Sequence, residues 1–428
     1  MDLLNQQSKK YPKKVAIQYN KTVMTYEQLN TTVQAIANTY YHDIKDTRIG
    51  IKVKNPLEAI ICILAALRAG KTIYLLNHHY KTYTEELIKA YHLKTVLTTC
   101  IKNPLNSQKN INITSKSSIR LFTTGSTGQA KCVIHSIDTL LASADIINKS
   151  LHYTHHDIWN CQLPFYHVSG LAILWRTLLA GATIQLDPSK TPYTHISCVE
   201  KQFEFLIKNP PKHPLKCILI GGSPIKKKLL LSAIQQNLPI YQSYGLTETG
   251  SACAITPLSK DTLNLSGKPL PHIKLKIKHK YIFVKGKSRC LGFEYPNNTI
   301  TNLNPNNYYN TQDYGCLTQD NQLKIFGRSS RMIIINGENI QLETIETMVK
   351  TLHNIKEFYM LAIKKNETLT LYGLVELENK QQNYKPFIKN AIKKHFSSLC
   401  IPEDIIEHSF KNALKLSYSD IKKTIQST

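Results

Sequence analysis

Short apolar runs alternate with longer segments along the first hundred residues. The runs VAIQY (15–19), TIYLL (72–76) and TVLTT (95–99) have the length and composition of strands. The segments 25–41 and 56–70 have the length of helices, and the second is apolar nearly all round, which predicts a helix buried between layers. Strands that alternate with helices in this way predict a parallel α/β sheet.

The pattern changes further along the chain. A helix is expected over 137–151, and residues 265–326 contain short strands separated by turns, which predict a small antiparallel or barrel-like section. Beyond an Asn336-Gly337 hairpin turn, the last hundred residues have a βαβ-like pattern of their own. We therefore expect an α/β fold with a large N-terminal domain over 1–327 and a small α+β C-terminal domain over 328–428.

The composition is that of a globular chain. At 428 residues the chain is long enough for one large and one small domain, or for two to three ordinary ones, and its hydrophobic content of 42% is enough for sizeable cores. The ten cysteines show neither a CxxC pair nor metal-ligand spacing, so reduced thiols are expected. The longest apolar stretch, 59–70, is too short to span a membrane and contains Arg68, and the first residues lack the apolar region of a signal peptide. We expect a soluble, cytoplasmic protein.

The net charge of +25 is the one unusual bulk property. Such a charge would suit nucleic acid, an anionic membrane surface or anionic small substrates. The lysines are spread along the whole chain in short groups such as Lys226–Lys228, without an arginine-rich arm or a known nucleic-acid-binding motif. A solvated basic surface that attracts anions is therefore expected, and a nucleic-acid partner is not.

The stretch LFTTGSTGQAKCVIHS (121–136) carries the first candidate chemistry. Small and hydroxylated residues lie between an apolar strand and a lysine that opens a second apolar run. Glycines let the backbone approach a ligand closely, and the hydroxyls, N–H groups and lysine can donate to a polyphosphate. The alternative is an ordinary polar loop. Cys132 follows Lys131, so this is not a Walker A loop. The candidate phosphate ligands are Thr123, Thr124, Gly125, Ser126, Thr127, Gly128 and Lys131.

Residues 163–180 supply a second group of candidates. His167 and Ser169 are expected at the end of a strand, where ligands of open α/β sheets gather, although a lone histidine is often structural. Arg176 is a charge inside the apolar run LAILWRTLLAG. It either extends to solvent, pairs with an internal acid, or binds a substrate carboxylate with its guanidinium fork.

The motifs GGSP (221–224) and YGLTETG (244–250) follow two later strands. The paired glycines either mark a turn or allow a flat ring to lie against the backbone. Tyr244 offers a face for stacking. Thr247 and Glu248 place a hydroxyl beside a carboxylate, which suits Mg²⁺ near phosphates, although a hydrated turn would look the same. Asp313 either caps a turn or binds ribose hydroxyls.

Five motifs in order, TTGSTGxxK, GGSP, YGLTETG, TQD and GRSSRMIIINGENI, resemble those of the adenylate-forming enzymes. That superfamily includes acyl-CoA synthetases, luciferases and peptide-synthetase adenylation domains, and the resemblance covers essentially the whole chain. It implies two wound α/β sheets and a small barrel in the N-terminal domain, with a mobile C-terminal domain after a hinge near Arg328. It also implies that a carboxylate attacks ATP to give an acyl-adenylate and pyrophosphate, after which the thiol of coenzyme A displaces AMP.

The resemblance assigns roles to individual residues. The loop and Lys131 would hold the β- and γ-phosphates, Thr247 would contact the α-phosphate and Glu248 would hold Mg²⁺. The other ATP contacts would be Gly221, Gly222, Ser223, Tyr244, Gly245, Asp313 and Arg328. The acid pocket would be lined by His167, which is also expected to take part in catalysis, with Ser169, Gly170, Arg176, Thr249, Gly250 and Ser251. Gly337 would lie at the coenzyme A channel. Lys415, or in second place Lys411, would be the catalytic lysine of adenylation.

Three positions depart from the family pattern. Ala130 replaces the proline before the loop lysine, Leu414 replaces the glycine before the catalytic lysine, and Ser330 replaces an acidic hinge residue. An inactive relative that only binds nucleotide is therefore one alternative, although Lys131 and Glu248 are both present.

The segment LPFYHVSGLAILWRTLLAGATIQL and the KNALKLS ending resemble one branch of the family, the o-succinylbenzoate–CoA ligases of menaquinone biosynthesis. Their substrate carries two carboxylates, of which only the aliphatic one is activated, so a cation must hold the other. Arg176 is the candidate for that cation. The remaining alternatives are a CoA ligase for another aryl or fatty acid, and an adenylation domain of the peptide-synthetase type.

Overall fold

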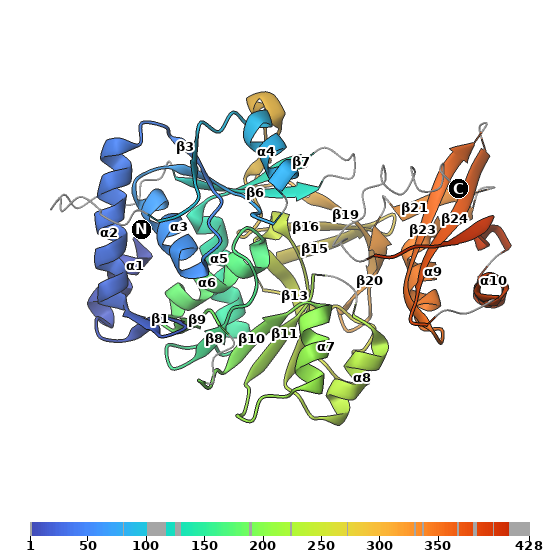
Figure 1. The fold of residues 1–428 in the computed structure, drawn as a ribbon. Helices are drawn as coiled ribbons and strands as arrows, with labels where there is room; N and C mark the ends of the chain where they lie inside the picture. Colours follow the sequence, from blue (N-terminus) through green and yellow to red (C-terminus); the bar gives the residue numbers. More distant parts are fainter. Residues whose placement is uncertain are drawn as a thin grey trace.

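The fold is that of a mixed α/β protein with several sheets, shown as a computed structural model in Figure 1. The structure describes residues 2–79, 81–100, 117–124, 130–187, 191–222, 225–271, 273–328, 331–335, 338–365, 368–379, 383–396 and 398–410.

The largest sheet has nine strands and a parallel centre. Strands β12, β11, β10, β8, β9 and β1 are parallel neighbours, and β2, β13 and β14 join the sheet antiparallel. In sheet order the strands are β14 (Lys268–Pro269), β13 (Ser251–Pro257), β12 (Ile240–Leu246), β11 (Cys217–Ile220), β10 (His195–Cys198), β8 (Ile158–Asn160), β9 (Thr183–Gln185), β1 (Val15–Tyr19) and β2 (Thr22–Thr25).

The second sheet has seven strands and carries the candidate phosphate loop between two of them. Strands β6 and β7 form an antiparallel hairpin in which Thr123 lies opposite Lys131. The other neighbours β4, β3 and β5 are parallel to β6. In sheet order the strands are β18 (Ile300–Asn302), β17 (Gly292–Glu294), β7 (Ala130–His135), β6 (Ser118–Thr124), β4 (Thr72–Leu75), β3 (Arg48–Ile51) and β5 (Thr95–Leu97).

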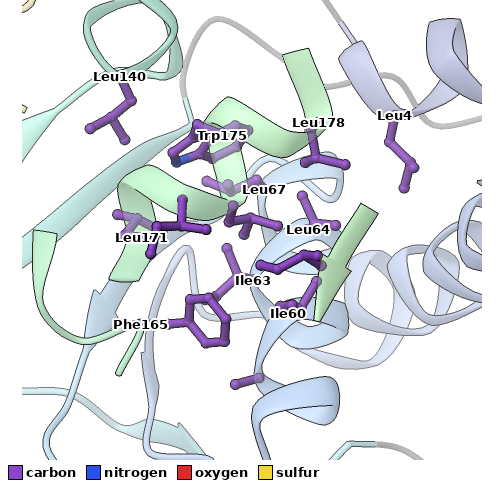
Figure 2. Close-up of a cluster of buried hydrophobic side chains, with 14 of the residues drawn as sticks. Leu4, Ile60, Ile63, Leu64, Leu67, Leu140, Phe165, Leu171, Trp175 and Leu178 are labelled. Atoms are coloured by element: carbon purple, nitrogen blue, oxygen red, sulfur yellow. The ribbon is translucent and has the colours of Figure 1, made fainter. Parts of the chain in front are cut away.

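One large hydrophobic core joins these two sheets through helices. Its side chains come from both sheets and from α1, α2, α3, α5 and α6, and Figure 2 shows Ile60, Ile63, Leu64 and Leu67 of α3 facing Trp175 and its neighbours on α6. The helices are α1 (Leu3–Lys10), α2 (Tyr26–Asp43), α3 (Pro56–Arg68), α4 (Lys81–Ala90), α5 (Ile137–Ser150), α6 (Val168–Ala180), α7 (Glu200–Lys208) and α8 (Lys227–Gln235).

Helix α3 shows how local sequence and packing agree. The Asn55 side chain accepts hydrogen bonds from the backbone N–H groups of Leu57 and Glu58, and Pro56 takes the first helical position, where no donor is needed. Ten consecutive residues, from Ala59 to Arg68, are buried, as the all-round apolar pattern predicted. Arg68, at the end of the run, forms an ion pair with Asp2 at 2.7 Å, which compensates its burial.

A four-stranded antiparallel sheet follows the two large ones in the chain. Its strands are β15 (Ile273–Lys278), β16 (Tyr281–Gly286), β19 (Tyr309–Leu317) and β20 (Leu323–Arg328). The pairing of β19 with β20 places Asp313 directly opposite Arg328. The sequence predicted a single antiparallel or barrel-like section here. Instead, β17 and β18 from the same stretch add to the seven-stranded sheet, and β14 adds to the nine-stranded one.

The C-terminal part has a hydrophobic cluster of its own, which includes Phe358, Met360 and Ile405. Strands β24 and β25 are parallel and are connected through α10, which is the βαβ pattern read from the sequence. In Figure 1 this part lies at one end of the molecule, beyond β20. Its elements are β21 (Met332–Ile335), β22 (Glu338–Gln341), α9 (Leu342–Val349), β23 (Ile355–Lys365), β24 (Thr368–Leu377), α10 (Tyr384–His395) and β25 (Asp404–Glu407).

The alternation of strands and helices predicted from the sequence is confirmed, with one local correction. His167 was expected at the end of a strand, but β8 ends at Asn160 and His167 is the N-cap residue of α6. The intervening residues form turns because Pro164 and the bends around it interrupt the apolar run. Among the described helices, none is both long and apolar enough to cross a membrane. All ten cysteines lie in the described part and are free thiols.

His195 of β10 yields a prediction about acid stability. The residue is fully buried against the rings of Tyr153 and Trp159, and burial lowers its pKa to about 4. In the unfolded chain His195 therefore becomes protonated as the pH falls through about 6.5. In the native state it becomes protonated only near pH 4. We expect this group to reduce the free energy of unfolding by up to about 3 kcal/mol as the pH falls through that window.

Urea unfolding of wild type and His195→Leu at several pH values measures this contribution. The variant should show a shallower loss of stability between pH 6.5 and 4, because the group that takes up the proton on unfolding is gone. Parallel curves for the two proteins would contradict the prediction.

Candidate functional site

A tight turn between β12 and β13 presents the first acidic group of the site. A single 3-10 turn over Thr247–Thr249 follows β12, and Gly250 continues it with a φ of 68°. The Thr249 side chain is buried, and its hydroxyl lies 3.0 Å from the carbonyl oxygen of Leu246 and 2.7 Å from that of Ser251. These two contacts connect the residues on either side of the turn. Glu248, at its centre, is 8% exposed. Glu248, Thr249 and Gly250 are buried, which argues against the alternative of a hydrated turn.

Lys131 and Tyr309 hold the Glu248 carboxylate from two different sheets. Lys131 Nζ lies 3.0 Å from Glu248 Oε1, and the Tyr309 hydroxyl donates to the same oxygen at 3.1 Å. The ammonium group also lies 4.0 Å from the centre of the Phe293 ring. Burial and the adjacent carboxylate both raise the pKa of Tyr309 above its ordinary value, so the hydroxyl stays protonated as a donor.

A second cluster surrounds Asp313 on β19. The Tyr244 hydroxyl donates to Asp313 Oδ2 at 2.6 Å, and Arg328 Nε donates to Oδ1 at 2.9 Å. The carboxylate is 5% exposed, while the Arg328 side chain remains half-exposed. The Arg328 backbone N–H donates to Glu343 Oε2 at 2.7 Å, which connects the end of β20 to α9. Asp313, Arg328 and Tyr244, predicted from separate motifs, are therefore brought together.

Two of the predicted glycines are required by close packing of backbone. A Cβ at Gly245 would lie 2.2 Å from the carbonyl oxygen of Ser251, and one at Gly221 would lie 2.4 Å from Ser243 Oγ. Gly222 differs, because its φ is 86° and a Cβ there would meet open space. Space beside Gly222 is compatible with a ligand lying against this backbone.

Arg176 is buried without an acidic partner among the described residues. Its side chain is 1% exposed, which excludes the reading in which it extends to solvent. Nη2 donates to Ser251 Oγ at 2.7 Å, the guanidinium lies 5.2 Å from the Trp159 ring, and Nε has no partner. Burial lowers its pKa to about 10, so it remains charged at neutral pH. A buried, uncompensated guanidinium is costly, which fits a role in binding an anion.

Backbone strain coincides with this contact. Ser251, the partner of Arg176, has a φ of 137°, a conformation that non-glycine residues rarely adopt. Such strain costs about 1–3 kcal/mol and is concentrated at functional sites. Ser251, Gly250 and Thr249 thus form a strained end to the turn that begins with Thr247, beside the buried Arg176.

The beginning of α6 forms the other side of the candidate acid site. A Cβ at Gly170 would lie 2.4 Å from the carbonyl oxygens of Leu163 and Pro164, so only glycine lets the helix start there. His167 is exposed, and its ring packs against Tyr166 with centroids 4.7 Å apart.

A cavity of about 250 Å³ lies next to this helix start. Tyr166 lines it, together with apolar side chains from β3, α3 and β4, and Lys54, His78 and His79 add basic groups to its wall. The His78 and His79 rings pack together with centroids 4.1 Å apart. A cavity with apolar walls and basic groups suits an anionic ligand that has an apolar part. The sequence reading did not single out these histidines, because no motif marks them.

Several predicted site residues lie outside the described residues. They are Gly125, Ser126, Thr127, Gly128, Ser223, Gly337, Lys411 and Lys415. Thr123 and Lys131, at the two ends of the predicted phosphate loop, are described as opposite members of the β6–β7 hairpin.

The donor set at Glu248 suits a magnesium ion. No cluster of three or more His, Cys, Asp or Glu side chains that could hold a metal occurs in the part of the chain that the structure describes. A single carboxylate is nevertheless what Mg²⁺ takes from proteins when substrate phosphates and water supply its other ligands. Glu248 therefore fits Mg²⁺ that arrives with a nucleotide and does not fit a resident metal.

Tyr309 and Phe293 are site residues that sequence reasoning missed. Tyr309 is four residues before Asp313, in the same motif, so its position was a usable signal. Phe293 belongs to the separate strand β17 and reaches Lys131 only through the pairing of β17 with β7. No sequence spacing indicates that contact.

Comparison with known proteins defines the class. The model of the AMP-binding enzyme family matches residues 4–120 and 118–281. That match covers more than half of the chain, so the chain belongs to the AMP-binding enzyme family, the adenylate-forming superfamily that its motifs resemble.

Within that family, the chain is similar to a particular group of ligases. The 2-succinylbenzoate–CoA ligase of Staphylococcus epidermidis is 27% identical over 441 residues, which cover 94% of this chain and 92% of the relative. The enzyme of the same name from Escherichia coli K12 is 26% identical over 375 residues, 82% of each protein.

Solved structures show the same fold. The O-succinylbenzoate coenzyme A synthetase of Bacillus subtilis in complex with AMP superposes with a TM-score of 0.86 at 22% identity, covering 97% of this chain and 98% of that one. The wild-type E. coli enzyme with a bound analogue of OSB-AMS gives a TM-score of 0.81 at 22% identity over 100% and 99% of the two chains. The B. subtilis enzyme has also been solved with ATP and a magnesium ion.

The contacts of Glu248 predict the effect of removing one hydroxyl. Tyr309→Phe keeps the ring beside Phe293 but removes the hydrogen bond to the carboxylate. We expect the dissociation constant of ATP in the presence of Mg²⁺ to rise about fivefold, equivalent to about 1 kcal/mol. Isothermal titration calorimetry measures this change. Tyr308→Phe is the matched control, because Tyr308 is adjacent and 39% exposed. Equal affinities for Tyr309→Phe and wild type would contradict the assigned role.

Proposed function

We propose that the protein is an ATP-dependent acid–thiol ligase that adenylates a carboxylic acid and transfers the acyl group to coenzyme A. The observation that carries this proposal is the meeting of Lys131, Glu248 and the Asp313–Arg328 pair, which come from three different sheets. These groups have the charges needed for the phosphates, the metal and the ribose of ATP. Membership of the AMP-binding family supports the same chemistry.

The reaction would proceed in two displacements. In the first, a carboxylate oxygen of the acid attacks the α-phosphorus of ATP, the bond to the bridging oxygen breaks, and pyrophosphate leaves. In the second, the thiol sulfur of coenzyme A attacks the acyl carbon, the thiol loses its proton, and AMP leaves with the acyl–oxygen bond electrons. Positioning and charge neutralisation would supply most of the rate enhancement.

The roles of the residues follow from their places in the site. Lys131 would bind the β- and γ-phosphates, and Asp313 with Arg328 would bind the ribose. Glu248 would hold Mg²⁺, which neutralises phosphate charge when bound, and Thr247 would contact the α-phosphate. Before ATP binds, Lys131 and Glu248 satisfy each other, so the nucleotide must exchange this ion pair for contacts of its own.

We infer that the acid carries a second carboxylate, as o-succinylbenzoate does. Arg176 supports this inference, because it is buried, charged and without an acidic partner among the described residues. Its Nε has no hydrogen-bond partner, and Ser251 holds one Nη group, so the guanidinium is already oriented. The similarity to 2-succinylbenzoate–CoA ligases supports the same substrate, and menaquinone biosynthesis as its context.

We further propose that residues 328–428 form a mobile domain that turns about a hinge near Arg328. Their separate hydrophobic cluster supports this division. A contact that crosses this boundary, the Lys226–Glu357 ion pair at 3.9 Å, would have to change in such a rotation. Lys415 is the proposed adenylation lysine, and Gly337 is proposed to line the coenzyme A channel in the second half-reaction.

A pyrophosphate-release assay tests the proposed reaction. Protein, ATP and Mg²⁺ are combined with o-succinylbenzoate, benzoate, octanoate or amino acids, with and without coenzyme A. We expect release only with o-succinylbenzoate, and formation of its CoA thioester by mass spectrometry. Release with another acid would keep the ligase chemistry and reject this substrate. No release from folded protein with any acid would favour the inactive nucleotide-binding relative.

Arg176→Met tests the role of the buried guanidinium. Methionine keeps much of the apolar contact with Trp159 but removes the charge, so stability should be unchanged or higher. The KM for o-succinylbenzoate should rise on the order of 100-fold, because a charged hydrogen-bonded contact is lost. The analogue without the ring carboxylate serves as the matched substrate control, and its KM should not rise. Equal losses for both acids would show that Arg176 shapes the pocket without recognising a carboxylate.

A further inference from the structure

A buried histidine lies directly behind the turn that presents Glu248. His135 is the last residue of β7, and its side chain is fully buried. Its Nε2 lies 2.7 Å from the carbonyl oxygen of Thr247, and its Nδ1 lies 2.9 Å from the hydroxyl of Thr139 in the first turn of α5. Neither His135 nor Thr139 belongs to the five motifs on which the proposed function rests.

These two contacts determine which ring nitrogen carries the proton. A carbonyl oxygen can only accept, so Nε2 must carry a hydrogen and donate it to Thr247. In the neutral ring Nδ1 is then an acceptor. The Thr139 hydroxyl also lies 2.9 Å from the carbonyl oxygen of Ser136, so its single hydrogen is shared between that oxygen and Nδ1. Burial lowers the pKa of His135 to about 4, and the hydrogen bond to Thr247 and the charge of Glu248 only partly oppose that shift. The ring is therefore neutral at pH 7.

The position of His135 on its strand explains why this contact matters to the site. Side chains alternate along a strand, so Lys131 and His135 lie on the same face of β7. Lys131 contacts the carboxylate of Glu248, while His135 contacts the carbonyl one residue earlier. A Cβ at Gly250 would lie only 3.6 Å from His135 Cε1, so the turn rests against the imidazole.

We propose that His135, which donates from Nε2 to the carbonyl of Thr247, is a positioning residue that fixes the Thr247–Glu248 turn for Mg²⁺ and the α-phosphate. The inference rests on the proposed function for the identity of the ligands. His135 does not touch substrate in this arrangement. It acts through the backbone of Thr247, which sets the direction of the next side chain, Glu248.

A set of variants separates positioning from simple stabilisation. His135→Leu removes the donor, and His135→Gln keeps an N–H donor near the place of Nε2. Thr139→Val keeps the imidazole but removes the hydroxyl that contacts its Nδ1. His195→Leu is the matched control, because His195 is also fully buried, also has a pKa lowered to about 4, and belongs to β10, away from the turn.

The discriminating measurement is the gain in ATP affinity that Mg²⁺ provides, obtained by calorimetry with and without the ion. We expect His135→Leu to reduce that gain about tenfold, while ATP affinity without metal stays within about twofold of wild type. His135→Gln should restore most of the gain, and Thr139→Val should lose a smaller part of it. His195→Leu should lower only the melting temperature. The ¹⁵N shifts of the His135 ring in labelled protein should report a protonated Nε2 and an unprotonated Nδ1.

These measurements test the role of His135 independently of which acid is the substrate. The positioning role would be overturned if Mg²⁺ did not increase the ATP affinity of wild type. It would also be overturned if that increase were equal in His135→Leu and wild type. A ring that carries no proton on Nε2 would overturn it as well. If His135→Leu does not fold, Thr139→Val and His135→Gln make the same comparison. Failure of every acid in the pyrophosphate assay would reject the proposed function, yet the ATP titrations and the ring shifts would still decide the role of His135.

Discussion

The packing of α3 and α6 between the two large sheets is the constraint on which the rest of the structure depends. Both helices are apolar on nearly every side, and their side chains join one core with α1, α2 and α5 (Figure 2). This core fixes one sheet relative to the other. The candidate site is built across that junction, since Lys131 belongs to the seven-stranded sheet and Glu248 follows a strand of the nine-stranded one. A shift of one sheet against the other would change the distance between these groups, and the energy of their ion pair depends on that distance.

The charged groups of the site differ in how they are compensated before substrate binds. Lys131 and Glu248 satisfy each other, and Asp313 receives hydrogen bonds from Tyr244 and Arg328. Arg176 is buried with only Ser251 as its polar side-chain partner in the described part of the chain, and Ser251 has a strained backbone. The first two clusters are pre-organised at little cost in stability. The buried Arg176 is destabilising in the free protein, as is expected of a charge that is compensated only when an anionic ligand binds.

The high net charge has a simpler physical explanation than a dedicated macromolecular binding partner. The candidate substrates, which are ATP, coenzyme A and a dicarboxylate, are all anions, and a basic surface raises their local concentration and their rate of encounter. Lys54 places part of that charge beside the cavity near α6. Charge that is spread over many lysines acts over about the Debye length, so its effect on encounter should weaken as salt is added.

The sequence by itself determined the class of fold, the order of most elements and the motif residues of the candidate nucleotide site. These features depend on local patterns, since apolar periodicity, glycine pairs and turn residues act within about twenty positions. Tertiary structure alone decided that Phe293 and Tyr309 meet Lys131 and Glu248, that His135 supports Thr247, and that the predicted barrel-like section divides its strands among three sheets. It also excluded the reading in which Arg176 extends to solvent, and it gives Arg176 no acidic partner among the described residues, because burial and pairing are properties of packing. Such contacts join residues 61 to 162 positions apart, and no local pattern encodes which strands become neighbours.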